Sequence, residues 1–341
     1  MAEPLRLGAL RVGALRVGII GVGTMGAHHV RVFGELDGAE LVAIADVSME
    51  RLAEIERPDS VHAYGDYREM LAEERLEAVS IAVPTRQHLD VALACIEHAV
   101  PLLVEKPLAA SVDECLRLKD AALGADVPLM VGHIERFNPG VVELKKRIEQ
   151  GEAGRLVQIQ ARRVGPFFPR ERDVGVVQDL ATHDIDVLRH LVACDIDRVR
   201  AETRSGIMSP HEDALSAVLR FEDGTIGTLD VNWLSPIKDR ELRVLGERGL
   251  FKLDYLTQQL TFYPSSAESA SPASPSDGIA IEVAKQEPLR VELDSFLRVV
   301  RGEEAPRVGA DDAIAAMRVV EALVESAQRG EALALSVGDS A

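Results

Sequence analysis

Aromatic residues are scarce in this sequence and make up 4% of its 341 residues. Proteins that bind single-stranded nucleic acid stack the bases on aromatic side chains, so this scarcity argues against such a surface. Basic residues are also outnumbered: 38 Lys and Arg stand against 56 Asp and Glu, which gives a net charge of −18. A chain this acidic repels phosphate backbones. We therefore expect no nucleic-acid partner.

Cysteines, metal-ligand clusters and long apolar runs are also lacking. The three cysteines (Cys95, Cys115 and Cys194) have neither metal-site nor redox-motif spacing, and no signal peptide is evident. We expect a reducing, cytoplasmic location. No apolar run approaches the roughly 18 residues of a membrane span, so no membrane partner is expected. The nine histidines form no metal set, and His28 and His29 are predicted to be structural.

Strand and helix patterns alternate over residues 15–133. Apolar strands are predicted at 15–20, 40–47, 78–84, 100–105 and 127–133, and helices at 24–34, 49–56, 87–98 and 111–122. Strands that are apolar on both faces and separated by helices are typical of a parallel sheet covered on both sides. We therefore predict an α/β protein whose residues 15–133 form a doubly wound, Rossmann-type domain. Residues 1–14 are predicted to be an N-terminal extension.

The pattern changes after about residue 150. We predict a strand at 155–164, alternating runs at 212–235 and 239–263 with hairpin turns at 221–225 and 246–249, and helices at 179–193 and 311–329. These elements predict a second, α+β domain over 134–341 with a mostly antiparallel sheet. The Ser/Pro-rich stretch near 264–278 is predicted to be a mobile loop, and Gly330 to end the last helix.

A glycine-rich turn follows the first predicted strand. The segment VGIIGVGTMGAHHV contains Gly-x-Gly-x-x-Gly between that strand and the next helix. Such glycines permit a tight turn and close approach of a pyrophosphate, and the helix N-terminus offers N–H groups to the anion. The second strand ends in Asp46, where a carboxylate can bind ribose hydroxyls. The predicted dinucleotide contacts are Gly21, Gly23, Thr24, Met25, Gly26 and Asp46.

The choice between NAD and NADP depends on the residues around Asp46. A carboxylate there repels a 2′-phosphate, and Val47, Ser48 and Met49 provide no immediate arginine to receive one. Arg51 lies one turn further on and is the residue that leaves NADP open. NAD is the predicted cofactor.

Lys106 stands at the carboxyl end of an apolar strand, in the stretch VPLLVEKPL. Pro107 cannot continue the ladder, so the strand ends there. Ligands of doubly wound folds bind outside the carboxyl ends of the strands. A lysine at a strand end can simply extend to solvent. Near a nicotinamide, however, its ammonium can stabilise the alkoxide that forms as a hydride leaves.

The segment DLATHDIDVLRH supplies a candidate base. At helical spacing, Asp179, His183, Asp186 and His190 share one face, and Asp179 can orient His183. The alternative is a solvated polar face. Asp184 projects from the apolar side and is predicted to be a buried, hydrogen-bonded structural group.

These motifs together resemble the Gfo/Idh/MocA oxidoreductase family over about residues 15–330. The resemblance rests on the glycine turn, on VPTRQHLDVALACIEHAVPLLVEKPLA and on the Asp179-x-x-x-His183 pair. It implies that Lys106 and His183 are catalytic with Asp179 in support. The resemblance implies too that the domain over 134–341 binds the substrate and has a large, mostly antiparallel open sheet, commonly used for oligomerisation, and that the protein is a homodimer or homotetramer. It also implies cofactor contacts from Pro84, Thr85, His88, Glu105 and Lys106.

Two further segments, VGHIERFNPGV and ARRVGPFFPRERDVGVVQDLATHDIDV, resemble the family members that oxidise the 3-hydroxyl of UDP-N-acetylglucosamine. Four arginines precede the catalytic helix, and a guanidinium fork matches the oxygens of a diphosphate. Pairing with the protein's many carboxylates is the alternative explanation. The predicted substrate-binding residues are Arg136, Asn138, Arg162, Arg163, Arg170 and His183.

We therefore predict an NAD-dependent dehydrogenase that oxidises a sugar hydroxyl to a ketone, with a nucleotide sugar as its small-molecule substrate. The alternatives are an inositol or polyol 2-dehydrogenase, or a UDP-sugar-uronate 3-dehydrogenase. A non-catalytic NAD(H) sensor is a third, but a sensor would not need Lys106 and His183 together.

Overall fold

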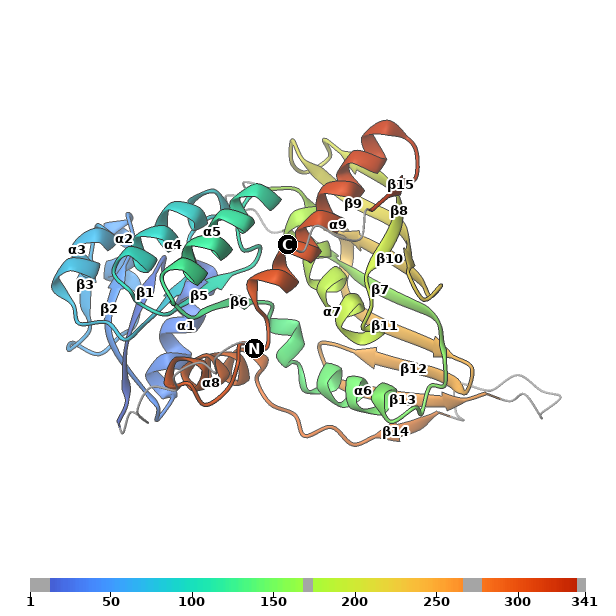
Figure 1. Ribbon diagram of the computed structural model, residues 1–341, viewed down its shortest axis with the longest axis horizontal. Helices are drawn as coiled ribbons and strands as arrows, with labels where there is room; N and C mark the ends of the chain where they lie inside the picture. The colour runs from blue at the N-terminus through green and yellow to red at the C-terminus, as the bar shows by residue number, and fades with distance from the viewer. Residues whose placement is uncertain (1–12, 168–173, 266–277, 336–341) are drawn as a thin grey trace. The chain divides into compact units, whose positions relative to one another are not determined.

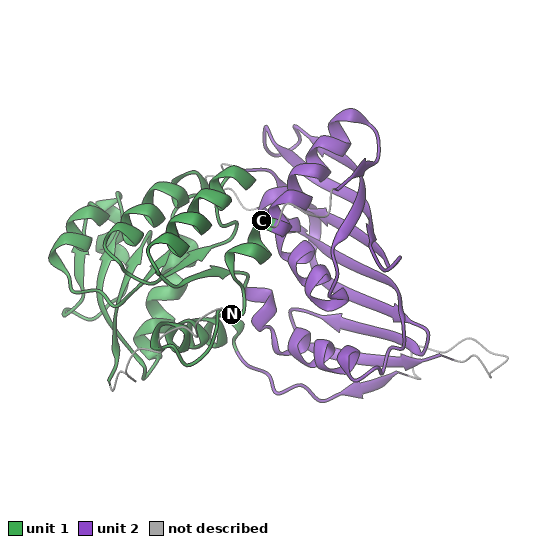
Figure 2. Ribbon diagram, viewed as in Figure 1, with its two compact units in different colours: residues 1–133, 287–314 green, residues 134–286, 315–341 purple. Residues whose placement is uncertain are grey.

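The computed structural model in Figure 1 describes residues 13–167, 174–265 and 278–335. The chain forms two compact units, which Figure 2 shows in different colours. Unit 1 comprises residues 1–133 and 287–314, and unit 2 comprises residues 134–286 and 315–341. The break after His133 coincides with the predicted domain boundary. Most of the predicted extension and of the predicted loop near 264–278 lies outside the described residues.

Unit 1 is built on a parallel sheet of six strands in the order β3-β2-β1-β4-β5-β6. Its strands are β1 (Leu15–Ile20), β2 (Ala39–Ala45), β3 (His62–Tyr64), β4 (Ala78–Ile81), β5 (Leu102–Glu105) and β6 (Leu129–Gly132). Every residue of β4, β5 and β6 is buried, as expected when helices cover both faces of a sheet. The strand order reverses between β1 and β4, and ligands bind at the carboxyl ends beside such a point.

The helices of unit 1 follow the predicted pattern with three additions. They are α1 (Thr24–Glu35), α2 (Met49–Glu54), α3 (Tyr67–Glu73), the 3₁₀ turn η1 (Thr85–Gln87), α4 (His88–Glu97), α5 (Val112–Gly124) and α8 (Pro288–Arg301). Ser48, Asp66 and Ser111 cap α2, α3 and α5 by accepting backbone N–H groups. The sequence analysis missed α3, α8 and strand β3.

Helix α8 corrects the predicted domain assignment. It packs against α1, and residues 287–314 belong to unit 1, whereas we predicted all of 134–341 to form the second domain. Leu289, Leu293 and Phe296 make an apolar face that is buried. The period of such a face predicts a helix but does not say which part of the molecule covers it.

Unit 2 contains a nine-stranded sheet in the order β14-β13-β12-β11-β7-β10-β9-β8-β15. Its strands are β7 (Leu156–Pro166), β8 (Ile196–Ser205), β9 (Glu212–Phe221), β10 (Ile226–Asn232), β11 (Leu234–Gly246), β12 (Gly249–Asp254), β13 (Gln259–Pro264), β14 (Ile279–Ile281) and β15 (Leu333–Ala334). All neighbours are antiparallel except β7 and β10. The predicted turns at 221–225 and 246–249 connect β9 to β10 and β11 to β12. Two sheets of the predicted types confirm the fold class.

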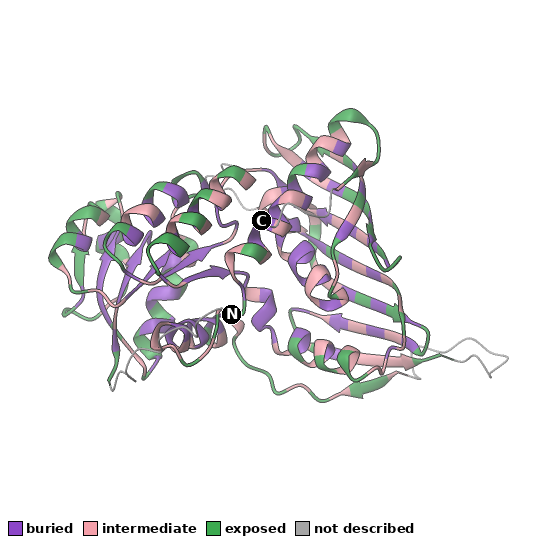
Figure 3. Ribbon diagram, viewed as in Figure 1, coloured by how far each residue is buried: buried purple, intermediate pink, exposed green. Residues whose placement is uncertain are grey.

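The helices of unit 2 lie on one face of this sheet (Figure 1). They are the 3₁₀ turn η2 (Ile134–Phe137), α6 (Pro139–Glu149), the π-turn η3 (Val177–Ala181), α7 (Thr182–Val192) and most of α9 (Ala310–Arg329). The strands accordingly alternate buried with exposed residues, as the colours along the sheet show in Figure 3. Gly330, at φ +67°, follows α9 as predicted. Among the described residues, no helix is long and apolar enough to cross a membrane.

Candidate active site

The three glycines of the turn between β1 and α1 have three different surroundings. A Cβ on Gly21 (φ +89°) would lie 2.7 Å from the carbonyl group of Ala82, and one on Gly26 would lie 1.9 Å from the oxygen of Gly21. A Cβ on Gly23 would meet no atom within 4 Å. Gly21 and Gly26 therefore allow the backbone to pack closely within the turn. Gly23 leaves the surface of the turn free of a side chain, so that a ligand can approach the backbone. No side chain caps α1 at Gly23, so the N–H groups of Thr24 and the next residues are available to an anion.

Asp46 fixes the end of β2 beside this turn. Its two carboxylate oxygens accept N–H groups from Val22 at 2.9 Å and Ser48 at 2.8 Å. The guanidinium of Arg51 lies 3.7 Å away. The carboxylate is held at the position where a dinucleotide ribose binds, and each oxygen keeps a lone pair for a hydroxyl. These residues fit an NAD cofactor.

Lys106 follows the last residue of β5, and a buried hydrogen-bond chain fixes its backbone. The backbone N–H of Lys106 donates to Glu105 Oε2 at 3.2 Å. Glu105 Oε1 lies 3.1 Å from His29 Nε2, and His29 Nδ1 lies 2.7 Å from Ser80 Oγ in the core of the sheet. Burial raises the pKa of Glu105, but the hydrogen bond and charge of His29, with the charge of Lys106, outweigh it and lower the pKa overall.

This inward arrangement bears on one predicted contact. Glu105 was predicted to bind the cofactor, and its side chain is buried with internal partners for both oxygens, so it is not the side chain that would make this contact. Its carboxylate fits beside β6 because residue 132 is a glycine, whose Cβ would stand 3.2 Å from Glu105 Cδ. Glu105 and His29 therefore support Lys106, and the structural interpretation of His29 is confirmed.

His88 is a second predicted cofactor contact that faces inward. Its ring nitrogens lie 2.8 Å from the carbonyl oxygen of Pro107 and 2.9 Å from that of Val83. The ring is buried, and burial lowers its pKa. His88 thus ties the chain after β4 to the chain after Lys106 instead of reaching a ligand. Of the neighbouring predicted contacts, Pro84 is exposed and Thr85 is buried.

The predicted helix at 179–193 begins as a π-turn, which changes the expected geometry. Asp179 lies within η3, and His183 lies in the first turn of α7. A π-turn bonds residue i to i+5, so the regular four-residue spacing that we used to align Asp179 with His183 does not apply across it. Both side chains are half-buried in unit 2. Their catalytic roles stay predictions.

Asp186 and His190 do not belong to a solvated polar face, which was the alternative to a catalytic face on this helix. Asp186 is fully buried and accepts two hydrogen bonds from Arg136, each at 2.7 Å. His190 Nδ1 lies 3.5 Å from Arg136 Nη1. The sequence pattern missed this because Arg136, in η2, presents its guanidinium to the polar side of α7.

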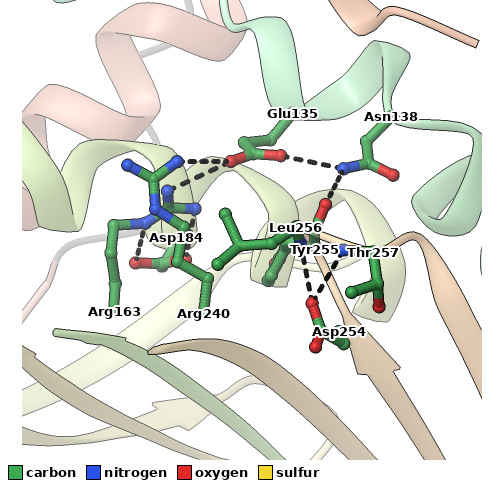
Figure 4. Close-up of polar contacts among 9 residues, drawn as sticks. All are labelled: Glu135, Asn138, Arg163, Asp184, Arg240, Asp254, Tyr255, Leu256 and Thr257. Atoms are coloured by element: carbon green, nitrogen blue, oxygen red, sulfur yellow. Dashed lines mark hydrogen bonds and ion pairs between the residues drawn. The ribbon is translucent and has the colours of Figure 1, made fainter. Parts of the chain in front are cut away.

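A buried ion-pair network lies between β7 and α7 (Figure 4). Arg163, at 2% exposure, donates to both oxygens of Asp184 at 2.9 and 3.0 Å and to Glu135 at 3.1 Å. Burial disfavours its charge, but Asp184 and Glu135 raise the pKa of Arg163. Asp184 is buried and hydrogen-bonded, as predicted. The prediction that Arg163 binds substrate is wrong, because its guanidinium is committed to these two carboxylates.

Four other predicted substrate residues have internal partners or lie outside the described residues. Asn138 caps α6, and its amide donates to Glu135 and to the carbonyl of Tyr255, each at 3.2 Å. Arg162 points to the opposite side of the sheet from Arg163 and pairs with Asp230 and Asp239. Arg136 has the buried carboxylate partner described above. Arg170 lies outside the described residues.

Sequence reasoning missed Arg240 and Tyr255, which complete the network in Figure 4. Arg240 Nη1 lies 3.7 Å from Glu135 Oε1, and the guanidinium carbon of Arg163 lies 5.3 Å from the centre of the Tyr255 ring. A signal was present: Arg163 is in phase with buried Ile159 and Ala161, and a charge at such a position requires a buried partner. No sequence pattern identifies that partner. Among the described residues, no group of three His, Cys, Asp or Glu is arranged to hold a metal.

Two family models match the chain. Residues 15–133 match an oxidoreductase family with an NAD-binding Rossmann fold, and residues 141–252 match the GFO/IDH/MocA C-terminal domain. The chain belongs to the Gfo/Idh/MocA oxidoreductase family. It is an oxidoreductase that acts on CH–OH groups, as predicted.

Relatives in the Gfo/Idh/MocA family differ in substrate. UDP-N-acetylglucosamine 3-dehydrogenase of Acidithiobacillus ferrooxidans is 28% identical over 300 residues, covering 88% of this chain and 92% of that protein. Inositol 2-dehydrogenase 1 of Saccharopolyspora erythraea is 29% identical, covering 92% and 94%. A solved levoglucosan dehydrogenase in complex with NADH superposes with a TM-score of 0.85 at 20% identity, over 95% and 99% of the two chains. That likeness shows the shared fold.

Proposed function

We propose that this protein is an NAD-dependent dehydrogenase that oxidises the 3-hydroxyl of UDP-N-acetylglucosamine to a ketone. The dehydrogenase chemistry is supported by three features of unit 1. They are the open glycine turn, the Asp46 carboxylate fixed by backbone hydrogen bonds, and Lys106 at the end of β5. These features belong to one edge of one parallel sheet, where ligands of this fold bind.

The chain's own residues have distinct tasks in the proposed reaction. The glycine turn and Asp46 would hold the dinucleotide, which would supply the acceptor for a hydride from the sugar carbon. His183 takes the proton of the hydroxyl group, and Asp179 supports that imidazole. Lys106 donates a hydrogen bond to the same oxygen and stabilises its developing charge. The supports from Glu105 and His88 keep the backbone on both sides of Lys106 in place.

NAD is the cofactor that we propose over NADP. The Asp46 carboxylate accepts two N–H groups where it stands, and a negative charge held there disfavours a 2′-phosphate. Arg51, 51% exposed and 3.7 Å from Asp46, is the residue through which NADP would gain a partner. Its pairing with Asp46 favours NAD.

The nucleotide sugar is supported by a relative and opposed by another of equal similarity. The UDP-N-acetylglucosamine dehydrogenase matches 88% of this chain, but the inositol dehydrogenase matches 92% at nearly the same identity. The second candidate function is therefore an inositol or polyol 2-dehydrogenase. The segments that suggested the nucleotide sugar contain Arg136, Asn138 and Arg163, which bind within the protein and do not separate the two.

A substrate panel tests the proposal. Formation of NADH or NADPH would be followed with UDP-sugars and free polyols, each with both cofactors. We expect the highest kcat/KM with UDP-N-acetylglucosamine and NAD, and competitive inhibition by UDP. Efficient oxidation of free inositol without inhibition by UDP would replace the nucleotide sugar with the polyol. Equal kcat/KM with NAD and NADP would remove the cofactor assignment.

We also propose that the protein acts as a homo-oligomer joined through the outer face of the unit 2 sheet. That face carries no helix in the described chain, and its strands expose Val218, Ile226 and Leu245. Large exposed apolar side chains on a broad sheet are typical of an interface.

A further inference from the structure

Two basic residues on β11 share a single ion pair among the described residues. Lys238 lies within a break in the pairing of β11 with β7, where the register shifts between Leu234 and Asp239, and Arg240 lies just after it. Arg240 is in phase with the buried residues Leu242 and Val244, so its side chain faces the side of the sheet that carries α7.

Arg240 has few contacts for a guanidinium that is only 30% exposed. Its one ion pair within the described chain is the 3.7 Å approach to Glu135 Oε1, an oxygen that already accepts a hydrogen bond from Arg163 at 3.1 Å. Its side chain donates no hydrogen bond to any described residue. Figure 4 shows the two guanidinium groups converging on the same carboxylate. An arginine carries five N–H donors in a planar fork, and most of those of Arg240 remain available.

Lys238 adds a second positive charge. It is exposed and has no ion pair in the part of the chain that the structure describes. Arg240 is the main cause that lowers the pKa of Lys238, with burial and Arg163 adding to it. The pKa of Arg240 is lowered first by burial and then by Arg163, although Glu135, Asp184 and Asp179 act against this. The two cations therefore repel each other, and an anion bound between them would relieve that repulsion.

The position of these residues relates them to the candidate catalytic helix. Arg240 is within electrostatic reach of Asp179, in the π-turn that precedes His183. By contrast, Arg162 and Arg243 point to the other side of the same sheet and have carboxylate partners there. Lys238 and Arg240 are thus basic groups with donors to spare on the side that carries Asp179 and His183.

We propose that Arg240 and Lys238 bind the diphosphate of the substrate. This inference rests on the proposed function, whose nucleotide sugar supplies that anion, and it replaces the clamp that we had predicted at Arg163. Guanidinium forks match phosphate oxygens in a bidentate way, and a lysine adds a mobile charge. A neutral polyol has no group that would need either residue.

The test measures binding of UDP to the full-length protein with saturating NAD, by isothermal titration calorimetry. Arg240→Ala is expected to raise the Kd of UDP by at least about tenfold, the loss of one strong charge-assisted hydrogen bond. Lys238→Ala, a change at an exposed side chain, is expected to raise it several-fold. Arg243→Ala is the matched control, because it removes the same charge from the same strand on the opposite face, and it should leave the Kd unchanged.

Each result decides a different point. Unchanged UDP binding in both Arg240→Ala and Lys238→Ala would overturn the inference while leaving the nucleotide-sugar activity intact. If Arg240→Ala does not fold, Lys238→Ala decides alone. A wild-type protein that does not bind UDP and oxidises neutral polyols would remove the proposed substrate as well as this site. Equal losses in Arg243→Ala and Arg240→Ala would show a general effect of charge and would also overturn the site.

Discussion

Arg163 and Arg240 lie on neighbouring strands and face the same side of the sheet, yet their guanidinium groups have different surroundings. Arg163 is 2% exposed and donates to Asp184 and Glu135. Arg240 shares one of those carboxylate oxygens at 3.7 Å. The sequence showed the arginines before the candidate catalytic helix but not the carboxylates beside each one. Whether an arginine is structural or binds a ligand therefore depended on its partners, which come from distant parts of the chain.

This difference predicts a stability effect at Arg163. Arg163→Ala would leave Asp184 and Glu135 buried without their main partner, and breaking a buried pair costs about 3–5 kcal/mol. Urea unfolding followed by the fluorescence of Trp233, the one tryptophan of the sequence, measures this. Arg162→Ala is the matched control, since its pairs are half-exposed and worth about 1 kcal/mol or less. Equal losses of stability in the two variants would contradict the assignment.

At the proposed reacting centre, the residue-scale expectation concerns turnover. Lys106→Ala and His183→Ala should each lower kcat by about two orders of magnitude or more, because acid–base and oxyanion help would be lost. NAD binding should persist in His183→Ala, since this residue belongs to unit 2 and the glycine turn to unit 1. Near-normal turnover in either variant would show that the catalytic residues are wrongly assigned.

At the scale of elements, the sequence predicted most of the unit 1 strands and helices, but it missed the long elements α6, α8 and β8 as well as some short ones. Strand β3 has three residues and α3 has seven, too few to show a period. The π-turn η3 is a local change in hydrogen bonding that leaves no mark on apolar spacing. Helix α8 was not predicted, and its residues were assigned to the second domain although they belong to unit 1, because an apolar face does not specify what covers it.

Helix α1 offers an element-scale test of the cofactor site with an internal control. Gly26→Ala would place a Cβ 1.9 Å from the oxygen of Gly21, so the turn must open and NAD binding should be lost. Gly34 lies near the end of the same helix, and a Cβ there meets nothing within 4 Å. Gly34→Ala should leave NAD binding unchanged and stabilise the helix by roughly 0.5–1 kcal/mol. Calorimetry with NAD and thermal unfolding of both variants measure these effects, and retained NAD affinity in Gly26→Ala would argue against the site.

For the whole molecule, composition argued against a nucleic-acid partner but did not identify the substrate. An acidic chain with few aromatics argued against nucleic acid, and the glycine turn with Asp46 led to the dinucleotide fold. Substrate specificity depends on which side chains remain available to a ligand after others have paired within the folded protein. Of the six residues predicted to bind substrate, Asn138, Arg136 and Arg163 have buried internal partners, and Arg162 points to the other side of the sheet.

The outer face of the unit 2 sheet carries the last prediction, which concerns assembly. Ile226 on β10 and Leu245 on β11 both pair with Gln158 of β7, so the two apolar side chains lie on one face of three adjacent strands. If copies of the chain join there, Ile226→Glu would bury a carboxylate in the interface and remove an apolar contact worth roughly 1.5–3 kcal/mol in each copy. The dimer Kd should then rise by at least about a hundredfold. Sedimentation over a range of concentrations would show this as a shift to the monomer mass.

Leu123→Glu on α5 is the control: this side chain is 69% exposed but lies in unit 1, so the same chemical change away from the sheet should keep the assembly. If both variants keep the wild-type mass, or both lose it, the interface does not lie on this face of the sheet.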